Sequence, residues 1–554
     1  MHIISFSPFG YEGSLVTVEV DLRRGIPAVD MVGLADNAVK EARERMRAAI
    51  RNSGFDFPLE RILISLSPAD VKKEGAGFDL AIALAVLDKS VRPSVPDPFD
   101  FGRAVLVMGE LELSGRIRAV RGVHAALFTA REQGLRYCIV PAENEAEAAL
   151  FSRGCKAADG CYGDPMRVFA AAHLSDAFTV LCGLSGREKD CKDGVVLEDS
   201  GETQGDSGIF VSSANQGSMH GTQKKEEKVV FSDFPLGDDY REIEGQAFLI
   251  RALQIAAAGR HNLIAYGSPG CGKTLALSRF YTLLPRLTEE EALPVTRIYS
   301  IAGMLPAGTR MMRDAPFRQP HQSSSLEGII GGGLHCRPGE ISLAHNGVLF
   351  LDEAADFRSS VLQALRVPLE EGKISLSRAG RTAVYPARFQ LLLAANPCPC
   401  GNFGSEDKIC LCHPRAVEEY WRRFSAPLLD RIDIRVALSN RRGESENEKC
   451  EKTGTAFLRT GIGRATAVQR MRQGKPNAHL EAAEIRILCP LDGETESALN
   501  DSARRFGFSS RGIHSCIKLA RTIADLEERR SIEKKDIEEA VLLHRNAGGI
   551  HLMF

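Results

Sequence analysis

The sequence lacks several features that would assign the protein to a membrane or to the cell exterior. It contains no uncharged apolar run long enough to cross a bilayer, so no transmembrane helix is predicted. Its start, Met1 to Pro8, shows no basic segment followed by an apolar stretch, so no secretory signal is expected. The net charge is only −2, which neither supports nor excludes binding to nucleic acid. We therefore expect a cytoplasmic protein without a membrane partner.

A disulfide framework is not expected either, although the chain contains 14 cysteines. Without a secretory signal, these cysteines are expected to be reduced thiols, some of them bound to metal. The 554 residues exceed what one hydrophobic core accommodates, and they predict about three or four domains. We expect a first domain at 1–182, a tether rich in Gly, Ser and charged residues at 183–230, an α/β core at 231–440 and a helical lid at 441–554.

The most informative stretch is a loop between an apolar strand and a helix-favouring run at 275–284. It fits the pattern G-x-x-x-x-G-K-[ST], in which glycines let backbone N–H groups point at phosphate oxygens. Its residues are Gly267, Ser268, Pro269, Gly270, Cys271, Gly272, Lys273 and Thr274. Lys273 would contact the β- and γ-phosphates of ATP, and Thr274 would bind Mg²⁺. The alternative is a glycine-rich turn that binds nothing.

Two acidic residues follow a second apolar strand at 347–351. Asp352 is placed to complete the Mg²⁺ shell, and Glu353 to polarise an attacking water. An apolar strand that ends in Asp-Glu is common by itself. Downstream of a phosphate loop, it predicts a Mg-ATP hydrolase.

Four cysteines form two C-x-C pairs across a short loop: Cys398, Cys400, Cys410 and Cys412. Four thiolates at this spacing can enclose a tetrahedral Zn²⁺ and stiffen the loop. However, C-x-C is tighter than the common C-x-x-C pair. Structural zinc and reduced free thiols therefore both remain open.

The first part of the chain predicts a mixture of strands and helices. Alternating apolar residues predict a strand at 15–22, and a second strand is expected at 62–66. The run 36–51 is rich in Ala, Glu, Lys and Arg and predicts an amphipathic helix, and 78–87 predicts a buried one.

Two segments of this part, 72–81 and 109–117, resemble the N-terminal domain of the ComM and YifB family of magnesium-chelatase-like AAA+ proteins. The resemblance implies an α+β domain similar to the Lon protease domain, of the ribosomal S5 domain 2-like type, before an AAA+ P-loop core and a helical lid. Lon-type enzymes use a Ser-Lys pair, and the serine position falls here on Gly77 and the lysine position on His124. Glycine cannot attack a carbonyl, so we expect a structural or DNA-contacting domain without protease activity.

The same resemblance assigns roles to three further residues. Asn396, after a third apolar strand at 389–395, would be the sensor that contacts the γ-phosphate or the lytic water. Arg431 matches the family's arginine finger, which completes a neighbour's site and implies a ring, with six members as the family expectation. The alternative is a salt bridge from Arg431 to Asp430 or Asp433. Arg511 would be the second sensor, reaching the γ-phosphate from the lid.

The family also has moving elements between these motifs. The run 373–385 alternates like a hairpin, and in relatives such hairpins point into the ring pore. Its basic residues are Lys373, Arg378 and Arg381. They would either bind DNA phosphates or lie on an ordinary solvated surface, and the sequence leaves both alternatives open. Lid helices are predicted at 456–473, 495–506, 510–530 and 532–545. The basic residues Lys518, Arg521, Arg529 and Arg530 are expected to be solvated helix charges.

The resemblance implies a ring motor that uses ATP and Mg²⁺ to move along single-stranded or branched DNA. Branch migration during recombination of incoming DNA in natural transformation would be its task. The alternative is a chelatase-like ATPase that remodels a protein partner for metal insertion. That system also uses a partner domain with a D-x-S-x-S site, and the sequence contains no such motif.

Overall fold

The structure is a computed structural model of the chain. It describes residues 1–33, 37–69, 73, 75–91, 103–152, 165–185, 229–243, 245–333, 335–378, 381–404, 408–438 and 454–545, without the side chains of 37–40. Most of the predicted linker, 186–228, therefore lies outside the described residues. Among the described residues, no helix combines the length and apolar character needed to cross a membrane.

The N-terminal part is built on a seven-stranded mixed sheet of order β3-β4-β2-β1-β5-β8-β9. Its strands are β1 (His2–Ser7), β2 (Ser14–Arg23), β3 (Val29–Val32), β4 (Arg61–Ser67), β5 (Ala104–Val107), β8 (Tyr137–Pro141) and β9 (Arg167–Ala171). The pairs β1–β2 and β2–β4 are antiparallel, and the other pairs are parallel. A short ribbon, β6 (Glu110–Leu111) with β7 (Ile117–Arg118), lies beside the sheet. The strands predicted at 15–22 and 62–66 are confirmed.

Helices cover both faces of this sheet, and its central strands β1, β5 and β8 are accordingly buried on both sides. The helices α1 (Asn37–Asn52), α2 (Asp79–Val91) and α5 (Leu174–Leu184) bury one face. On the other face lie α3 (Val123–Glu132) and α4 (Glu145–Ala148). The two helices predicted in this part, at 36–51 and 78–87, correspond to α1 and α2. They are joined by the buried carboxylate of Asp79, which accepts two hydrogen bonds from Arg45, at 2.7 and 3.1 Å.

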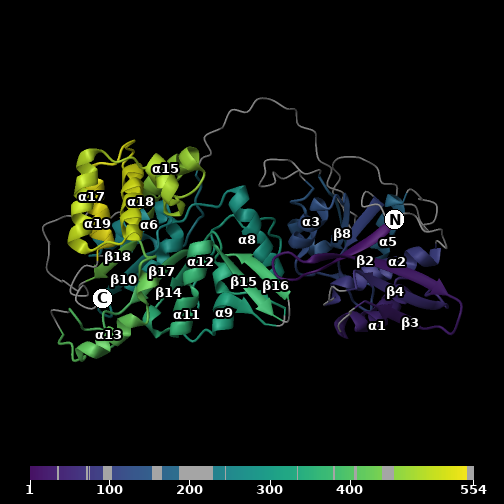
Figure 1. Cartoon of the computed structure of the whole chain (residues 1–554). Helices are drawn as coiled ribbons and strands as arrows, with labels where there is room; N and C mark the ends of the chain where they lie inside the picture. The colour runs from purple at the N-terminus through teal and green to yellow at the C-terminus, as the bar shows by residue number, and fades with distance from the viewer. Residues whose placement is uncertain are drawn as a thin grey trace, which may run out of the picture.

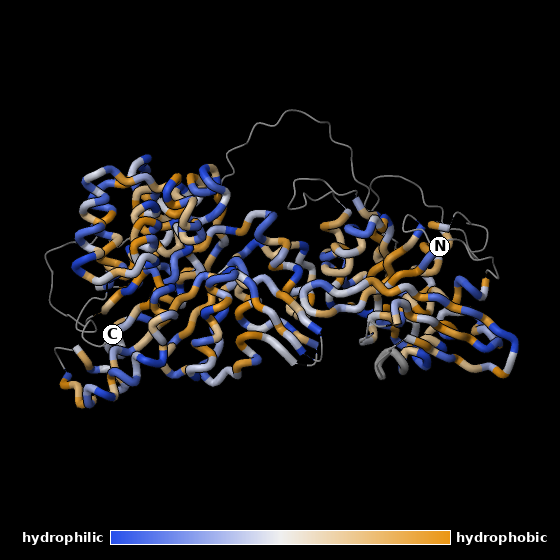
Figure 2. The backbone as a smooth tube through the Cα atoms, in the orientation of Figure 1, coloured by the Kyte–Doolittle hydropathy of each residue, from blue (hydrophilic) through white to orange (hydrophobic). Residues whose placement is uncertain are grey.

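The second part contains a five-stranded parallel sheet of order β11-β14-β17-β10-β18. Its strands are β10 (Leu263–Gly267), β11 (Phe317–Arg318), β14 (Val348–Leu351), β17 (Gln390–Ala395) and β18 (Ile434–Leu438). The three central strands, β14, β17 and β10, are buried along their whole length and read as nearly continuous apolar runs because both faces are covered, as is usual for parallel sheets. In Figure 2 apolar stretches follow the strands inside both parts of the molecule.

Short helices surround the parallel sheet, among them α6 (Ala247–Gly259), α7 (Lys273–Ser278), α8 (Glu289–Ala302), α9 (Leu326–Ile330), α10 (Glu340–Leu343), α11 (Ser359–Ala364), α12 (Arg366–Glu371), α13 (Pro414–Arg422) and α14 (Ala426–Leu429). The helix predicted at 275–284 is wrong in extent. The α-helix ends at Ser278, and the chain continues as a 3₁₀ helix, Arg279–Leu283. Leu284 is extended because it precedes Pro285, which disfavours the α conformation of the residue before it.

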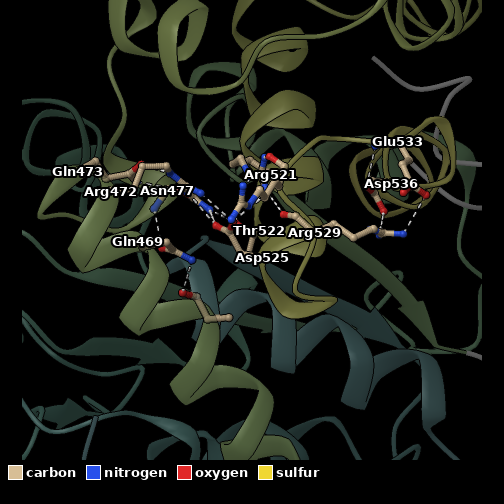
Figure 3. A network of polar contacts seen from close by, with 12 residues as sticks. Gln469, Arg472, Gln473, Asn477, Arg521, Thr522, Asp525, Arg529, Glu533 and Asp536 are labelled. Carbon is tan, nitrogen blue, oxygen red and sulfur yellow. Dashed lines mark hydrogen bonds and ion pairs between the residues drawn. The ribbon is translucent and has the colours of Figure 1, made fainter. Parts of the chain in front are cut away.

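Five helices form the lid: α15 (Thr455–Gln473), α16 (Ala482–Leu488), α17 (Gly493–Phe506), α18 (Ser510–Leu526) and α19 (Lys534–His544). Two of them, α15 and α18, pack against α6, so lid and core share one hydrophobic cluster. The expectation of solvated charges on α18 is wrong for Arg521, whose side chain is only 3% exposed. Figure 3 shows Arg521 and Arg472 converging on the buried carboxylate of Asp525.

The other predicted solvated charges of the lid differ among themselves. Arg529 is also largely buried, with its guanidinium paired to Asp536 and Glu533. Lys518 is mostly buried and donates to the carbonyl of Ala478 at 2.9 Å, so that expectation is wrong as well. Arg530 is exposed, as expected.

The predicted hairpin is confirmed as β15 (Lys373–Arg378) and β16 (Arg381–Pro386), which are antiparallel, with its turn, 379–380, outside the described residues. Figure 1 places it beside the N-terminal part. The turn between β1 and β2 covers one face of the hairpin. There the guanidinium of Arg381 lies 3.6 Å from the centre of the Phe9 ring, and a Cβ on Gly10 would come within 2.3 Å of the Ala383 Cβ.

Two further contacts join the N-terminal part to α8. Tyr11 lies between the guanidinium of Arg297, 4.4 Å from its ring centre, and the edge of Tyr385. Ser300 donates a side-chain hydrogen bond to the buried carboxylate of Glu147. The two sheets are therefore packed on each other through the hairpin and α8.

Candidate nucleotide-binding site

The backbone of the predicted phosphate loop is shaped to approach an anion closely. The loop leaves the C-terminal end of β10 and ends where α7 begins at Lys273. Gly270 and Gly272 both have positive φ angles, 82° and 83°, and among the described residues no atom lies within 4 Å of where a Cβ would be. A side chain at either position would be strained and would occupy the space in front of the backbone. The loop therefore fits the phosphates of a nucleotide.

The ammonium group of Lys273 contacts several polar groups of this loop. It donates to the carbonyls of Gly267 and Ser268, at 2.6 and 2.9 Å, and lies 3.4 Å from the side-chain oxygen of Asn396. Cys271 is buried, and its sulfur lies 3.7 Å from the same ammonium. Because β10 and β17 are neighbours in the sheet, the loop and Asn396 meet at the same edge.

Thr274 and Asp352 are arranged as ligands for a hard cation. The Thr274 hydroxyl and a carboxylate oxygen of Asp352 are 3.1 Å apart. Adjacent oxygens of an octahedral Mg²⁺ shell are roughly 2.9 Å apart, since each Mg–O bond is about 2.1 Å. Both groups are oxygen donors, so they fit Mg²⁺ in type and in spacing.

Glu353 follows Asp352 in a conformation that is rare for its residue type. Its φ is +48°, and its backbone N–H donates to the Asp352 carboxylate at 3.0 Å. Strained backbone of this kind persists where the surroundings hold it, and it is found often at functional sites. The bend leaves the Glu353 side chain exposed to solvent next to the cation ligands.

Asn396 is held in place by α13. Its backbone N–H donates to the hydroxyl of Tyr420 at 3.2 Å, and the Trp421 indole donates to the carbonyl of Pro397 at 3.0 Å. These contacts fix the end of β17. Gln246 supports the loop from the other side, because its amide donates to the carbonyl of Cys271 at 3.0 Å. From the sequence, Gly245-Gln246 resembles the family's adenine-side helix, with an ordinary turn as the alternative, and Tyr420 is not singled out.

The four predicted zinc ligands converge. The sulfurs of Cys398, Cys400, Cys410 and Cys412 all lie within 4.8 Å of one another, and three of their separations are 3.3, 3.6 and 3.7 Å. Four thiolates around Zn²⁺ are about 3.8 Å apart, since the Zn–S bond is about 2.3 Å. A hydrogen bond from the backbone of Asn402 lowers the pKa of the Cys400 thiol to about 6, whereas burial raises the pKa of Cys410, so the cluster shares its charge unequally.

This cysteine loop, residues 398–412 apart from 405–407, touches the phosphate loop. Gly401 has a φ of +77°, and a Cβ there would lie 2.6 Å from the Cδ of Pro269. The cysteine loop also connects the Asn396 strand to α13. It is therefore in contact with two elements of the nucleotide site at once.

Arg431 and Arg511 lie together, at the opposite end of the sheet from the phosphate loop. The carbonyl of Arg431 accepts a hydrogen bond of 2.9 Å from Asn262, which precedes β10. The phosphate loop follows the other end of this strand, about 16 Å away at 3.3 Å per residue. The guanidinium of Arg431 pairs with Glu370, and that of Arg511 lies 3.4 Å from the same carboxylate. These two arginines lower the pKa of Glu370.

The alternative partners considered for Arg431 are engaged elsewhere. Asp430 accepts a hydrogen bond from Ser509 at 2.8 Å, and Asp433 accepts one from Ser515 at 2.6 Å. The two arginines border a cavity of about 300 Å³ between core and lid, which Arg260 and Lys518 also line. Sequence reasoning missed Glu370, because a Glu-Glu pair on a short helix carries no motif.

The N-terminal part contains no Ser-Lys pair at the positions that the Lon resemblance indicates. Gly77 lines a cavity of about 620 Å³ between the two parts of the molecule. His124 is buried, and its ring nitrogens have no hydrogen-bond partner among the described residues. Burial lowers the pKa of this imidazole to about 3, so it is neutral.

Three family models match the chain. The model for the magnesium chelatase subunit ChlI matches residues 239–446, that for subunit ChlI of Mg-chelatase matches 18–144, and that for the ChlI C-terminal region matches 452–544. Lon protease 2 of Thermus thermophilus is 30% identical over 151 residues, which cover 26% of this chain and 18% of that protein.

Two relatives are similar over nearly their whole length. Competence protein ComM of Haemophilus influenzae is 36% identical over 543 residues, 97% of this chain and 96% of the relative. The YifB protein of Escherichia coli K12 is 37% identical over 535 residues, 96% of this chain and 94% of the relative. The chain therefore belongs to the ComM and YifB family of magnesium-chelatase-like AAA+ proteins.

Proposed function

We propose that the protein is a cytoplasmic ATP-dependent ring motor that acts on single-stranded or branched DNA and promotes branch migration. The observation that carries this proposal is the division of the site. Lys273, Thr274, Asp352 and Asn396 gather at one end of the parallel sheet, and Arg431 and Arg511 at the other. An arginine side chain spans about half of the roughly 16 Å between the two ends, so one chain cannot supply both groups to one nucleotide.

The residues near the phosphate loop divide the work of hydrolysis. Mg²⁺ bound to ATP would neutralise charge on the phosphates as the terminal bond breaks. Lys273 binds the β- and γ-phosphates, and Thr274 and Asp352 hold the cation. Glu353 accepts a hydrogen bond from the attacking water, and Asn396 orients that water or the γ-phosphate.

Arg431 and Arg511 act on the nucleotide of the next copy. Their shared carboxylate, Glu370, keeps both guanidinium groups at the surface of the cavity between core and lid. A contact that repeats head to tail in this way closes into a ring, for which six copies is the family expectation. Hydrolysis at each boundary then changes the angle between core and lid and moves the hairpin β15–β16.

DNA contact is proposed at the exposed part of this hairpin. Lys373 and Arg378 are exposed, whereas Arg381 is stacked on Phe9. Two of the three basic residues are therefore open to DNA phosphates. The name of the Haemophilus relative, a competence protein, supports a task in the recombination of incoming DNA. We also propose that the four cysteines hold a structural Zn²⁺, on the convergence of their sulfurs.

The second candidate is a chelatase-like ATPase that remodels a protein partner for metal insertion. It is favoured by the family models, which carry the name of a magnesium chelatase subunit. The two candidates differ in what stimulates hydrolysis. The motor responds to DNA, whereas the remodelling ATPase responds only to a chelatase partner.

The deciding experiment combines a DNA-stimulated ATPase assay with mixed rings. Lys273→Ala and Arg431→Ala should each be inactive alone, because each removes one half of every site. An equimolar mixture should regain activity wherever an intact Lys273 meets an intact Arg431 of the next copy. Failure of the mixture to hydrolyse ATP, with both variants folded and assembled, would refute the shared site. Hydrolysis by the wild type that ignores branched DNA would refute the motor.

A further inference from the structure

The cysteine loop carries two aliphatic side chains that are almost fully exposed. Ile409 is 83% exposed and Leu411 is 88% exposed, and they flank Cys410. Single exposed aliphatic residues are common on protein surfaces. These two differ because they lie two residues apart in a loop whose four cysteine sulfurs are drawn together. A loop fixed in this way presents its apolar side chains at a defined place.

That place is next to the nucleotide site. The sulfur of Cys410 lies 3.6 and 3.7 Å from those of Cys400 and Cys398. Gly401, which follows Cys400, is in direct contact with Pro269 of the phosphate loop. Any surface that covers the phosphate loop from outside must therefore also pass close to Ile409 and Leu411.

The chain itself offers such a surface at the end of the parallel sheet opposite the phosphate loop. Val367 is 54% exposed and lies one turn before Glu370 on α12, so both residues share a helix face. Glu370 holds Arg431 and Arg511. On α16, Ala482 and Ile485 line the same cavity as the two arginines. The helix that holds their shared carboxylate therefore presents an exposed apolar group, Val367.

We propose that the cysteine loop is the contact that seats one copy on the next. Ile409 and Leu411 pack against the face of the neighbouring copy that carries Val367 and Glu370, and this contact holds Arg431 over the phosphate loop. The inference rests on the proposed ring and names the surface that closes it. The occupant is a second copy because a nucleotide site that lacks its arginines is completed only by that face. DNA does not suit an uncharged aliphatic pair, since nucleic-acid binding depends on cationic groups.

The test uses the full-length double variant Ile409→Ser/Leu411→Ser. Its matched control is Ile26→Ser/Leu59→Ser, which replaces two aliphatic side chains of similar exposure, 87% and 81%, in the N-terminal part. For each protein we would measure zinc content, sedimentation with a non-hydrolysable ATP analogue, and ATPase activity per chain over a wide range of protein concentrations.

For the double variant we expect unchanged zinc and at least a tenfold rise in the concentration that gives half-maximal activity, with activity recovering when the protein is concentrated. The control should behave as the wild type. The inference is overturned if the double variant assembles at wild-type concentrations, or if it loses zinc, which would show that the two side chains hold the loop instead. If the wild type neither assembles nor depends on concentration, the proposed ring itself fails.

Discussion

The contact between the cysteine loop and the phosphate loop leads to a sharp prediction for Gly401→Ala. The variant adds one methyl group at a position whose φ is +77°, 2.6 Å from the Cδ and 2.7 Å from the Cγ of Pro269. The proline ring cannot rotate away from this methyl group, because it is fused to the backbone. The phosphate loop or the cysteine loop must therefore move.

The magnitude follows from two separate costs. The left-handed conformation costs a non-glycine residue about 1–2 kcal/mol, and forcing an extra methyl group into a packed contact costs about 1–3 kcal/mol. Gly404→Ala separates them, because Gly404 has nearly the same φ, +75°, and none of the described residues has an atom within 4 Å of its Cβ position. Both variants should lose the stability that the left-handed conformation costs. Only Gly401→Ala should also displace the phosphate loop.

The assay is steady-state ATP hydrolysis, together with zinc content and thermal unfolding. For Gly401→Ala we expect kcat to fall about tenfold or more, since each 1.4 kcal/mol of lost transition-state stabilisation is a factor of ten. Gly404→Ala should keep wild-type kcat and KM and should lose only the stability cost of the left-handed conformation. Equal kinetics for the two variants, both containing zinc, would refute the idea that the cysteine loop positions the phosphate loop.

Three other predictions concern the cation site, a buried histidine and the contact between the two parts. Asp352→Asn should lower kcat at least about 100-fold and raise the Mg²⁺ concentration needed for activity, measured by Mg²⁺ titration of hydrolysis. For His124 the folded pKa, about 3, lies below the unfolded value, so its contribution to stability is complete above pH 6.5 and is lost as the pH falls from 6.5 toward 3. His124→Leu should remove this loss, which is about 1.4 kcal/mol of unfolding free energy per pH unit, as measured by urea unfolding down to pH 5.5. An unchanged pH dependence of the unfolding free energy would contradict the assignment. Phe9→Ala should weaken the cover of the hairpin by about 1–2 kcal/mol and speed proteolysis near Arg381, whereas Phe9→Tyr should not.

Sequence reasoning found the parts of the site whose signal is local. Consecutive residues form the phosphate loop, the strand before Asp352 and the strand before Asn396. Residue spacing and apolar runs were therefore sufficient to predict these elements. The convergence of Cys398, Cys400, Cys410 and Cys412 also follows from close spacing along the chain. Residues far apart in the sequence gave no such signal, which is why Glu370 was missed as the partner of Arg431.

Burial of charged side chains was the other weakness. Arginine is a residue type that usually lies on the exposed face of a helix. Arg521 is instead enclosed in a polar network with Asp525, one turn later, and Arg472 on α15. Only the packing of α15 on α18 shows this. The proline at 285, seven residues beyond the end of α7 at Ser278, accounts for the extended Leu284.

The junction between the two sheets has a consequence for how the chain tolerates a break. The contacts of Phe9 with Arg381, of Tyr11 with Arg297 and of Glu147 with Ser300 hold the halves directly, independently of the covalent connection. A protease cut placed in 186–228 would therefore yield two fragments that migrate as one particle and come apart only in denaturant. The amino-terminal fragment would remain bound to the fragment that carries the nucleotide site.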